Sequence, residues 1–175
     1  MHTAYIGIGS NQGDRLSYCR EALRLLGQRE GIDVSNVSRW YESDALLDHS
    51  PSDQPPYINA AARLNTSLSP ESLISVLIAV EASLGRPHPR PRGEPRTIDL
   101  DLLLYDDLVI DTPALTIPHP QMTKRMFVLA PMCDIAPHLI HPLTGHSLSQ
   151  LRAALGVAPG RVELWSAGGC RRSVT

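Results

Sequence analysis

The sequence has little of what marks several protein classes. Aromatic residues make up 5% of its 175 residues, with a single phenylalanine, and its three cysteines (Cys19, Cys133 and Cys170) lack CxxC spacing. An odd number of distant cysteines argues against a disulfide framework or a thiolate zinc site and fits a reducing compartment. No apolar run could span a bilayer, and no basic segment precedes the first apolar stretch. We therefore expect a cytoplasmic protein without a signal peptide.

An excess of charge of one sign is also missing. Sixteen lysines and arginines nearly balance eighteen acidic residues, for a formal net charge of -2. This balance argues against nonspecific binding to nucleic acid or to a membrane surface. Apolar residues make up 42% of the chain and charged residues 19%, which is typical of folded globular proteins. The length suits one ordinary domain, which we expect over residues 1–155, followed by a tail over 156–175 without a clear period.

Apolar spacing predicts alternating strands and helices along the first 105 residues. Strands are expected over 3–9, 32–41, 57–65 and 97–105, with a loop over 42–56. Asp14 and Ser69 can cap two helices, whose core stripes are Leu16, Cys19, Leu23, Leu26 and then Leu73, Leu77, Val80, Leu84. The order βαββαβ predicts a ferredoxin-like α+β sandwich with an antiparallel sheet. Helical additions are expected over 120–155, including a helix from about Ser147 to Leu155.

Two aspartates stand out in the strand expected over 97–105. Alternate strand residues lie roughly 6.6 Å apart and point the same way, so Asp99 and Asp101 leave one face together. The other face, toward the core, carries Ile98, Leu100, Leu102 and Leu104. Two such charges repel unless a cation lies between them, and Mg²⁺ prefers one or two carboxylates with waters and phosphate oxygens. The alternative is an edge strand whose polar face carries two acids, and the DxD spacing alone does not decide.

A basic, proline-rich loop precedes the aspartates. It holds His88 and four arginines within eleven residues: Arg86, Arg90, Arg92 and Arg96. Arginine binds phosphate oxygens in bidentate fashion and stays charged at any working pH. A basic loop leading into an acidic strand therefore favours binding of a metal–polyphosphate. A solvated charged loop or an RNA-binding patch are the alternatives, although few aromatic residues interleave with the arginines to stack on bases.

Several further groups are weaker candidates. His119, between two prolines and followed by Lys124-Arg125, could donate to phosphate or act as a general acid, or simply shape a turn. The turn Gly9–Asp14 resembles a phosphate cradle at a helix N-terminus but lacks the lysine and glycine spacing of a P-loop, which favours an ordinary tight turn. The remaining histidines of this half of the chain are expected at the surface: His138, His141 and His146.

Tyr57 and Asn59 share one face of the strand expected over 57–65. An amide offers a donor and an acceptor, and a phenol ring offers an aromatic wall, so the pair suits a flat heterocycle. A core tyrosine beside a polar residue at a strand end would give the same pattern. The spacing alone leaves both interpretations open.

Together these segments resemble the 6-hydroxymethyl-7,8-dihydropterin pyrophosphokinase family of folate biosynthesis. The resemblance covers roughly residues 4–142 and rests on Ala4–Asp14, Tyr57–Ala61, Glu81–Arg86, Pro95–Tyr105, Ile117–Pro120 and Arg125–Pro131. It implies transfer of pyrophosphate from ATP to the pterin alcohol with release of AMP, on a ferredoxin-like fold. It also implies two Mg²⁺ ions, ATP as co-substrate and no nucleic-acid or membrane partner, and we expect a monomer.

The resemblance also assigns residues. Asp99 and Asp101 would bind the metal ions and share the catalytic role with Arg86, Arg92 and Arg96. The expected ATP-binding set is Glu81, Arg86, His88, Arg96, Leu102, Thr116, His119 and Arg125. The expected pterin-binding set is Ser43, Leu46, Tyr57, Asn59 and Phe127, with Phe127 stacking on the ring. The chain departs from the family at Gly93, followed by Glu94, where many members carry an aromatic residue.

Three rival functions use the same features. A kinase or nucleotidyl transferase for another substrate would need the same metal and arginines. A ferredoxin-like RNA-binding module would need aromatic residues on exposed sheet positions and would bind RNA in a salt-dependent way. An inactive paralogue would bind ATP with magnesium but not turn over, and Gly93 is the one feature that favours it.

Overall fold

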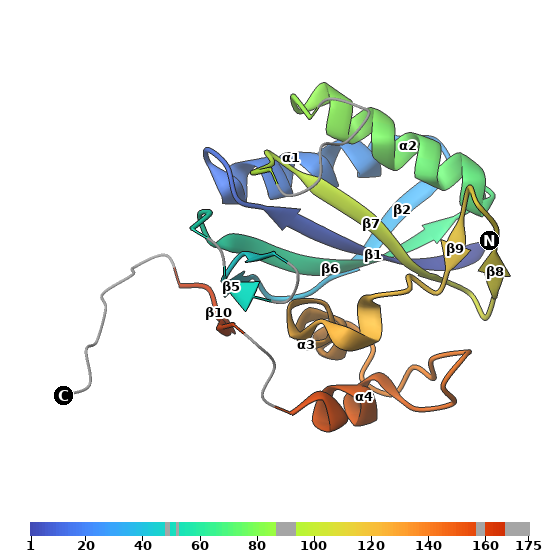
Figure 1. Cartoon of the computed structure of the whole chain (residues 1–175). Coiled ribbons are helices and arrows are strands. Elements are labelled where there is room, and N and C mark those ends of the chain that lie inside the picture. The colour runs from blue at the N-terminus through green and yellow to red at the C-terminus, as the bar shows by residue number, and fades with distance from the viewer. Residues whose placement is uncertain (48–49, 52, 87–93, 157–159, 167–175) are drawn as a thin grey trace.

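The main sheet is antiparallel and carries helices on both faces (Figure 1). The computed structural model describes residues 1–47, 50–51, 53–86, 94–156 and 160–166. The sheet follows the order β10-β3-β6-β1-β7, and β2 also pairs with β6. Its strands are β1 (His2–Ser10), β2 (Ile32–Val37), β3 (Tyr41–Ser43), β6 (Tyr57–Thr66), β7 (Asp99–Tyr105) and β10 (Val162–Leu164). The order β7-β1-β6-β2/β3 confirms the predicted ferredoxin-like α+β arrangement.

Helices α1 (Arg15–Gly27) and α2 (Pro70–Ser83) cover one face of the sheet, and α3 (Met126–Ile135) and α4 (Leu148–Leu155) lie on the other (Figure 1). A 3₁₀ turn, η1 (Met122–Lys124), precedes α3. Two short hairpins complete the fold: β4 (Leu46–Leu47) with β5 (Ser50–Pro51), and β8 (Ile110–Asp111) with β9 (Thr116–Ile117). Among the described residues, no helix is both long and apolar enough to cross a bilayer.

Helix starts follow the predicted caps. The Asp14 carboxylate accepts from the Ser17 amide at 3.1 Å, and the Ser69 hydroxyl accepts from the Ser72 amide at 3.3 Å. Ser147 and Gln150 form a reciprocal capping box at α4. A capping side chain satisfies an amide that has no partner within the helix, so each start is fixed locally.

Each face of the sheet has its own core. The first core cluster, under α1 and α2, includes the predicted stripe residues Cys19, Leu26, Leu73, Leu77 and Val80. The second core cluster, under α3 and α4, includes Tyr5, Ala61, Leu103, Leu104, Leu129 and Leu148. Because helices cover both faces, β6 and β7 are buried at most of their positions.

The expected strand over 32–41 is divided. Ser38 interrupts it because its amide donates to the Ala61 carbonyl at 2.9 Å, while its hydroxyl accepts from the Ala61 amide at 2.9 Å and donates to the Arg39 carbonyl at 2.7 Å. The chain resumes as β3, so the loop expected over 42–56 begins in a strand and contains the β4–β5 hairpin. The tail after Gly156 likewise contains β10, which is too short to show a period.

A bulge in β7 overturns one predicted orientation. Tyr5 pairs with Leu104 and Ile6 with Leu102, which leaves Leu103 as an extra residue. Leu104 therefore packs in the second core cluster and not beside Ile98, Leu100 and Leu102, as the alternation predicted. The aspartates precede the bulge and keep their expected alternation.

One predicted surface histidine is buried. His138 and His146 are exposed as expected, but only 3% of His141 is exposed. Its Nδ1 accepts from the Leu143 and Thr144 amides, both at 3.3 Å. The ring therefore organises the turn before α4, a role that residue spacing does not reveal.

Candidate active site

A cavity of about 630 Å³ opens on the sheet face that bears α3. Strand register builds its floor: Gly9 pairs with both Asp99 and Asn59, and Gly7 pairs with both Asp101 and Ala61. All of these residues line the cavity. The two glycines keep the middle of the floor free of side chains, so the aspartates of β7 and the polar residues of β6 face one shared space.

The cavity extends across the sheet from the β7 edge to the β10 edge. Ser43 and Val162 line it beyond β6. Four strand steps of about 4.8 Å each separate β7 from β10, or about 19 Å in all. The opposite wall comes from η1 and the start of α3: Gln121, Lys124, Arg125, Met126, Phe127 and Val128. A space of this width and volume can hold two ligands side by side.

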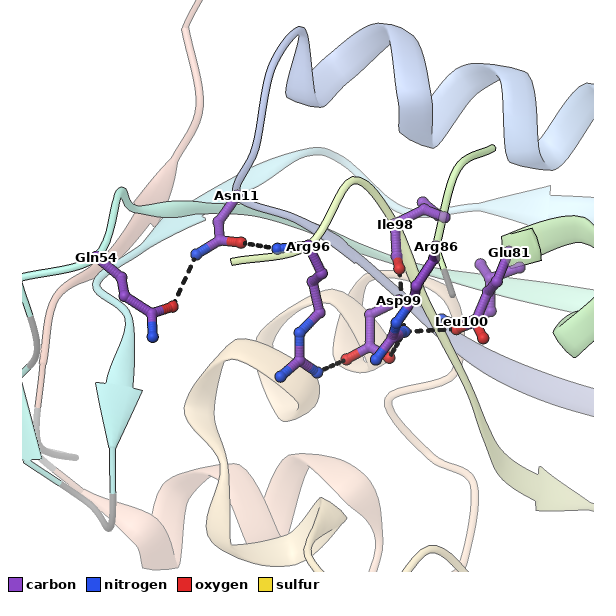
Figure 2. Close-up of polar contacts among 8 residues, drawn as sticks. All are labelled: Asn11, Gln54, Glu81, Arg86, Arg96, Ile98, Asp99 and Leu100. Atoms are coloured by element: carbon purple, nitrogen blue, oxygen red, sulfur yellow. Dashed lines mark hydrogen bonds and ion pairs between the residues drawn. The ribbon is translucent and has the colours of Figure 1, made fainter. Parts of the chain in front are cut away.

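Asp99 lies at the centre of a network of buried charges (Figure 2). Arg86 Nη1 donates to Asp99 Oδ1, to Glu81 Oε1 at 2.7 Å and to the Ile98 carbonyl at 3.0 Å. Arg96 Nη1 donates to Asp99 Oδ2 at 2.7 Å. Both carboxylate oxygens of Asp99 are therefore held by guanidinium groups, which fixes the orientation of the side chain toward the cavity.

These arginines also set the charge of Asp99. Burial raises the pKa of this carboxyl, but the charges and hydrogen bonds of Arg86 and Arg96 outweigh burial and hold the pKa below its usual value. Asp99 is therefore ionised at neutral pH. An ionised carboxylate is the form that a divalent cation binds.

Glu81 anchors the network from below. It is fully buried, and its Oε1 accepts from the Leu100 amide at 2.7 Å as well as from Arg86. The contact joins the end of α2 to β7. Glu81 therefore anchors Arg86 in the interior, and its place in the expected ATP-binding set stays a prediction.

Asn11 was not predicted as a site residue, yet it holds Arg96 in place (Figure 2). Its side-chain oxygen accepts from the backbone amide of Arg96 at 2.7 Å, and its backbone amide donates to the Arg96 carbonyl at 3.1 Å. Its Nδ2 donates to Gln54 Oε1 and the Pro55 carbonyl, both at 3.2 Å. The turn that resembled a phosphate cradle thus braces Arg96, at the end of the arginine loop.

The five residues of the expected pterin set all line the cavity. Asn59 Nδ2 donates to Ser43 Oγ at 2.9 Å, which fixes the orientation of the buried amide and leaves its oxygen for other partners. Phe127 lies across the cavity from β6, with the Arg125 guanidinium 5.6 Å from its ring centroid. Tyr57 and Phe127 together offer aromatic surface on two walls.

The expected ATP set is more dispersed. Arg96 and Arg125 line the cavity, and Arg86 shares a depression of about 60 Å³ with Arg96. Leu102 belongs to the first core cluster, and Thr116 lies half-buried in β9. Neither lines the cavity, so any contact with nucleotide would lie beyond it. Arg92, His88 and Gly93 lie outside the described residues.

His119 is fixed beside β7. Its amide donates to the Leu103 carbonyl at 2.9 Å, and its Nδ1 accepts from the Gln121 amide at 3.2 Å. Nε2 therefore carries the proton of the neutral ring. Burial, and then the charge of Arg125, hold the pKa of His119 below its usual value against the opposing charge of Asp99. The ring is neutral at pH 7 and can donate from Nε2.

The acidic residues of the cavity bear on whether it suits magnesium. Within the described ranges, no cluster of three or more histidine, cysteine or acidic residues could hold a metal ion. Asp99 and Asp101 line the cavity as a pair. Two carboxylates beside a space for phosphate and water are the ligands that Mg²⁺ takes when it arrives with a nucleotide, so the residues fit this ion.

Comparison with known proteins agrees with the geometry. The family model for 7,8-dihydro-6-hydroxymethylpterin-pyrophosphokinase (HPPK) matches residues 5–137. The chain is 41% identical over 165 residues to 2-amino-4-hydroxy-6-hydroxymethyldihydropteridine pyrophosphokinase of Synechocystis sp., covering 91% of this chain and 82% of that relative. It is 43% identical over 132 residues to the protein of the same name from Bacillus subtilis, covering 75% and 77%.

A solved structure supports the fold. Wild-type Plasmodium falciparum HPPK-DHPS aligns with a TM-score of 0.67 at 14% identity, over 87% of this chain. This chain spans 44% of that longer protein. At such low identity the likeness concerns the fold alone, whereas the family match and the two relatives concern the sequence itself. The chain therefore belongs to the 7,8-dihydro-6-hydroxymethylpterin-pyrophosphokinase family.

Proposed function

We propose that this chain transfers pyrophosphate from ATP to 6-hydroxymethyl-7,8-dihydropterin, with Mg²⁺ at Asp99 and Asp101. The observation that carries the proposal is the single cavity that joins this aspartate pair on β7 to the amide and aromatic side chains of Asn59, Tyr57 and Phe127. Its width of about 19 Å across the strands allows a nucleotide phosphate chain beside the aspartates and a flat ring beside β6.

The pterin ring would be recognised by side chains that lie against its two faces and its edge. Tyr57 and Phe127 would enclose its faces, and the amide oxygen of Asn59 would accept from a ring N–H. Ser43 orients that amide through its 2.9 Å hydrogen bond, and Leu46 closes the edge. The ring hydroxymethyl group would then point along the floor toward β7.

The phosphate chain would meet cations from the segment before β7 and from the opposite wall. Arg96, Lys124 and Arg125 line the cavity and can bind its oxygens, while Nε2 of neutral His119 can donate one hydrogen bond. Bound Mg²⁺ would supply further charge neutralisation on the phosphates. The new bond joins the pterin oxygen to the β-phosphorus as the bond from that phosphorus to the α–β bridging oxygen breaks. AMP leaves with the bridging oxygen, and the hydroxyl proton passes to solvent.

The charged residues around Asp99 would position the reacting groups and compensate their charge. Arg86 and Glu81 fix Asp99, and Asn11 fixes Arg96. Because phosphoryl-type transfers depend on geometry and electrostatics more than on covalent chemistry, small displacements of these groups should be costly. The expected participation of Arg92 and His88 belongs to the same proposal.

Product analysis tests the reaction. The protein is incubated with ATP, magnesium and the pterin alcohol, and nucleotides and pterins are separated by chromatography. AMP and pterin diphosphate should form in equal amounts and only with magnesium present. Formation of ADP would instead favour an ordinary kinase.

The proposal also includes a monomeric, cytoplasmic enzyme. Size-exclusion chromatography with light scattering should therefore give the mass of a single chain.

Substitution of the aspartates tests the metal site. Asp99→Ala or Asp101→Ala should lower turnover by about 10²-fold or more, because each removes a carboxylate at the developing charge. The matched control is Asp111→Ala, which alters an exposed aspartate of β8 away from the cavity. Near-normal turnover in either cavity variant would remove the metal role.

A further inference from the structure

The segment 160–166 lies beyond the residues that the family model matches, which end at 137. It nevertheless joins the main sheet: Val162 pairs with Ser43 and Leu164 with Tyr41. The Trp165 amide donates to the Trp40 carbonyl at 2.9 Å, which extends the contact past β10. The last strand of the sheet is therefore supplied by the C-terminal part of the chain and borders the strand that carries Ser43.

Arg161 ties this strand to the segment that follows β3. Its amide donates to Asp44 Oδ2 at 2.9 Å, and its carbonyl accepts from the Asp44 amide at 3.1 Å. Its guanidinium lies 3.3 Å from Glu42 Oε2 and 3.7 Å from Asp44 Oδ1. Glu42 and Asp44 are alternate residues with like charges, so the guanidinium between them offsets their repulsion.

Gly160 adds an apolar contact to the same junction. A Cβ at this position would come within 3.0 Å of Leu46 Cδ2, and the backbone has a φ of 82°, in the left-handed region. Leu46 therefore packs directly against the backbone ahead of β10. Asp44 and Leu46, on either side of Ala45, are therefore both held by the segment Gly160–Arg161, through hydrogen bonds, an ion pair and close packing.

Arg161 and Val162 also line the cavity, at the same end as Ser43, Asp44 and Leu46. We propose that Arg161 and β10 form the outer wall of the pterin half of the site, and that Arg161 is a positioning residue that sets pterin affinity. This inference rests on the proposed function. The aspartates lie four strand steps away on β7, so binding of the phosphates should depend little on this wall.

Steady-state kinetics with each substrate varied in turn test the proposal. Arg161→Ala should raise the KM for the pterin about 10-fold and leave the KM for ATP and kcat within about twofold. The reason is that the lost contacts with Glu42 and Asp44 hold only the wall of the pterin half. Arg161→Lys should recover part of the effect, since it keeps the charge but not the forked geometry. Direct titration with the fluorescent pterin should give a matching rise in Kd.

Two further variants separate this role from general stability. Arg24→Ala removes an exposed arginine that pairs with Glu21 on α1, away from the cavity, and should leave both KM values unchanged. Asp44→Asn keeps the size of the side chain and an oxygen that can accept from the Arg161 amide, but removes the charge that faces the Arg161 guanidinium. It should also raise the pterin KM. Melting temperatures of all variants establish that they are folded at the assay temperature.

The outcomes are distinguishable. An unchanged pterin KM in both Arg161→Ala and Asp44→Asn, in a protein whose parent releases AMP, would overturn the inference and leave the proposed function standing. An equal rise in the KM for ATP would also overturn it, because a general loosening of the fold would then explain the data. Absence of AMP release by the parent would refute the proposed function, while pterin titration would still report on the wall.

Discussion

Glu81→Gln is the substitution for which the structure gives the clearest expectation. It keeps the size of the side chain but removes the charge that faces Arg86 in the interior. Only 6% of Arg86 is exposed and none of Glu81, so water cannot replace the lost anion. The Gln oxygen can still accept from the Leu100 amide, whose distance to Glu81 Oε1 is 2.7 Å. The change therefore isolates what the negative charge of Glu81 contributes to the buried ion pair with Arg86.

The magnitude follows from the burial. Removal of one partner of a buried ion pair costs about 3–5 kcal/mol, and Asp99, which keeps its contact with Arg86, should hold the loss near the lower end. For a chain of this length, about 3 kcal/mol of unfolding free energy corresponds to a fall in Tm of about 9 °C. Turnover should also fall, by about 10-fold, because Arg86 orients Asp99 at the cavity.

Urea unfolding followed by circular dichroism measures the first effect, and AMP release measures the second. Glu21→Gln on α1 is the control, because its ion pair with Arg24 is exposed to solvent and should contribute little. A stability loss below about 1 kcal/mol for Glu81→Gln would refute the reasoning, since it would mean that Asp99 alone compensates the charge of Arg86.

Two other predictions follow from the same structure. Asn11→Ala should lower the unfolding free energy by about 1–3 kcal/mol in urea titrations, because the partly buried Arg96 amide loses its 2.7 Å acceptor; a loss restricted to turnover would contradict this. Burial lowers the pKa of both His119 and His141, so the unfolded chain takes up protons below about pH 6.5 that the folded chain does not. Stability should therefore fall as pH drops from 7 to 5, by at most about 1.4 kcal/mol per pH unit for each ring. His119→Asn and His141→Asn should each flatten the pH dependence, and an unchanged slope in both would contradict the assignment.

Much of the site could be predicted because its residues lie on regular elements. Asp99 and Asp101 alternate on one strand, as do Tyr57 and Asn59, and strand geometry alone places each pair on one face. What alternation could not supply was the register that aligns Asp99 with Asn59 through Gly9. Register depends on which strands become neighbours, and that is a property of the whole sheet.

Predictions were weakest where a contact joins distant segments. Nothing near Asn11 in the sequence indicates that it would hold Arg96, because 85 residues separate them. Glu81 has the pattern of a polar residue near a helix end, and only its burial between α2 and β7 shows that it positions Arg86. The bulge at Leu103 similarly results from pairing with β1, and it turns the Leu104 side chain to the opposite face of the sheet.

The sequence by itself determined the helix caps, the apolar stripes, the βαββαβ order and the presence of an acidic pair beside a basic loop. These features depend on local geometry and on side-chain chemistry, which a single segment carries. Tertiary structure alone decided that the acidic pair and the residues of the expected pterin set share one cavity, and that Arg161 lines it. It decided these because the free energy of such contacts depends on burial and on partners far along the chain, which no local pattern encodes.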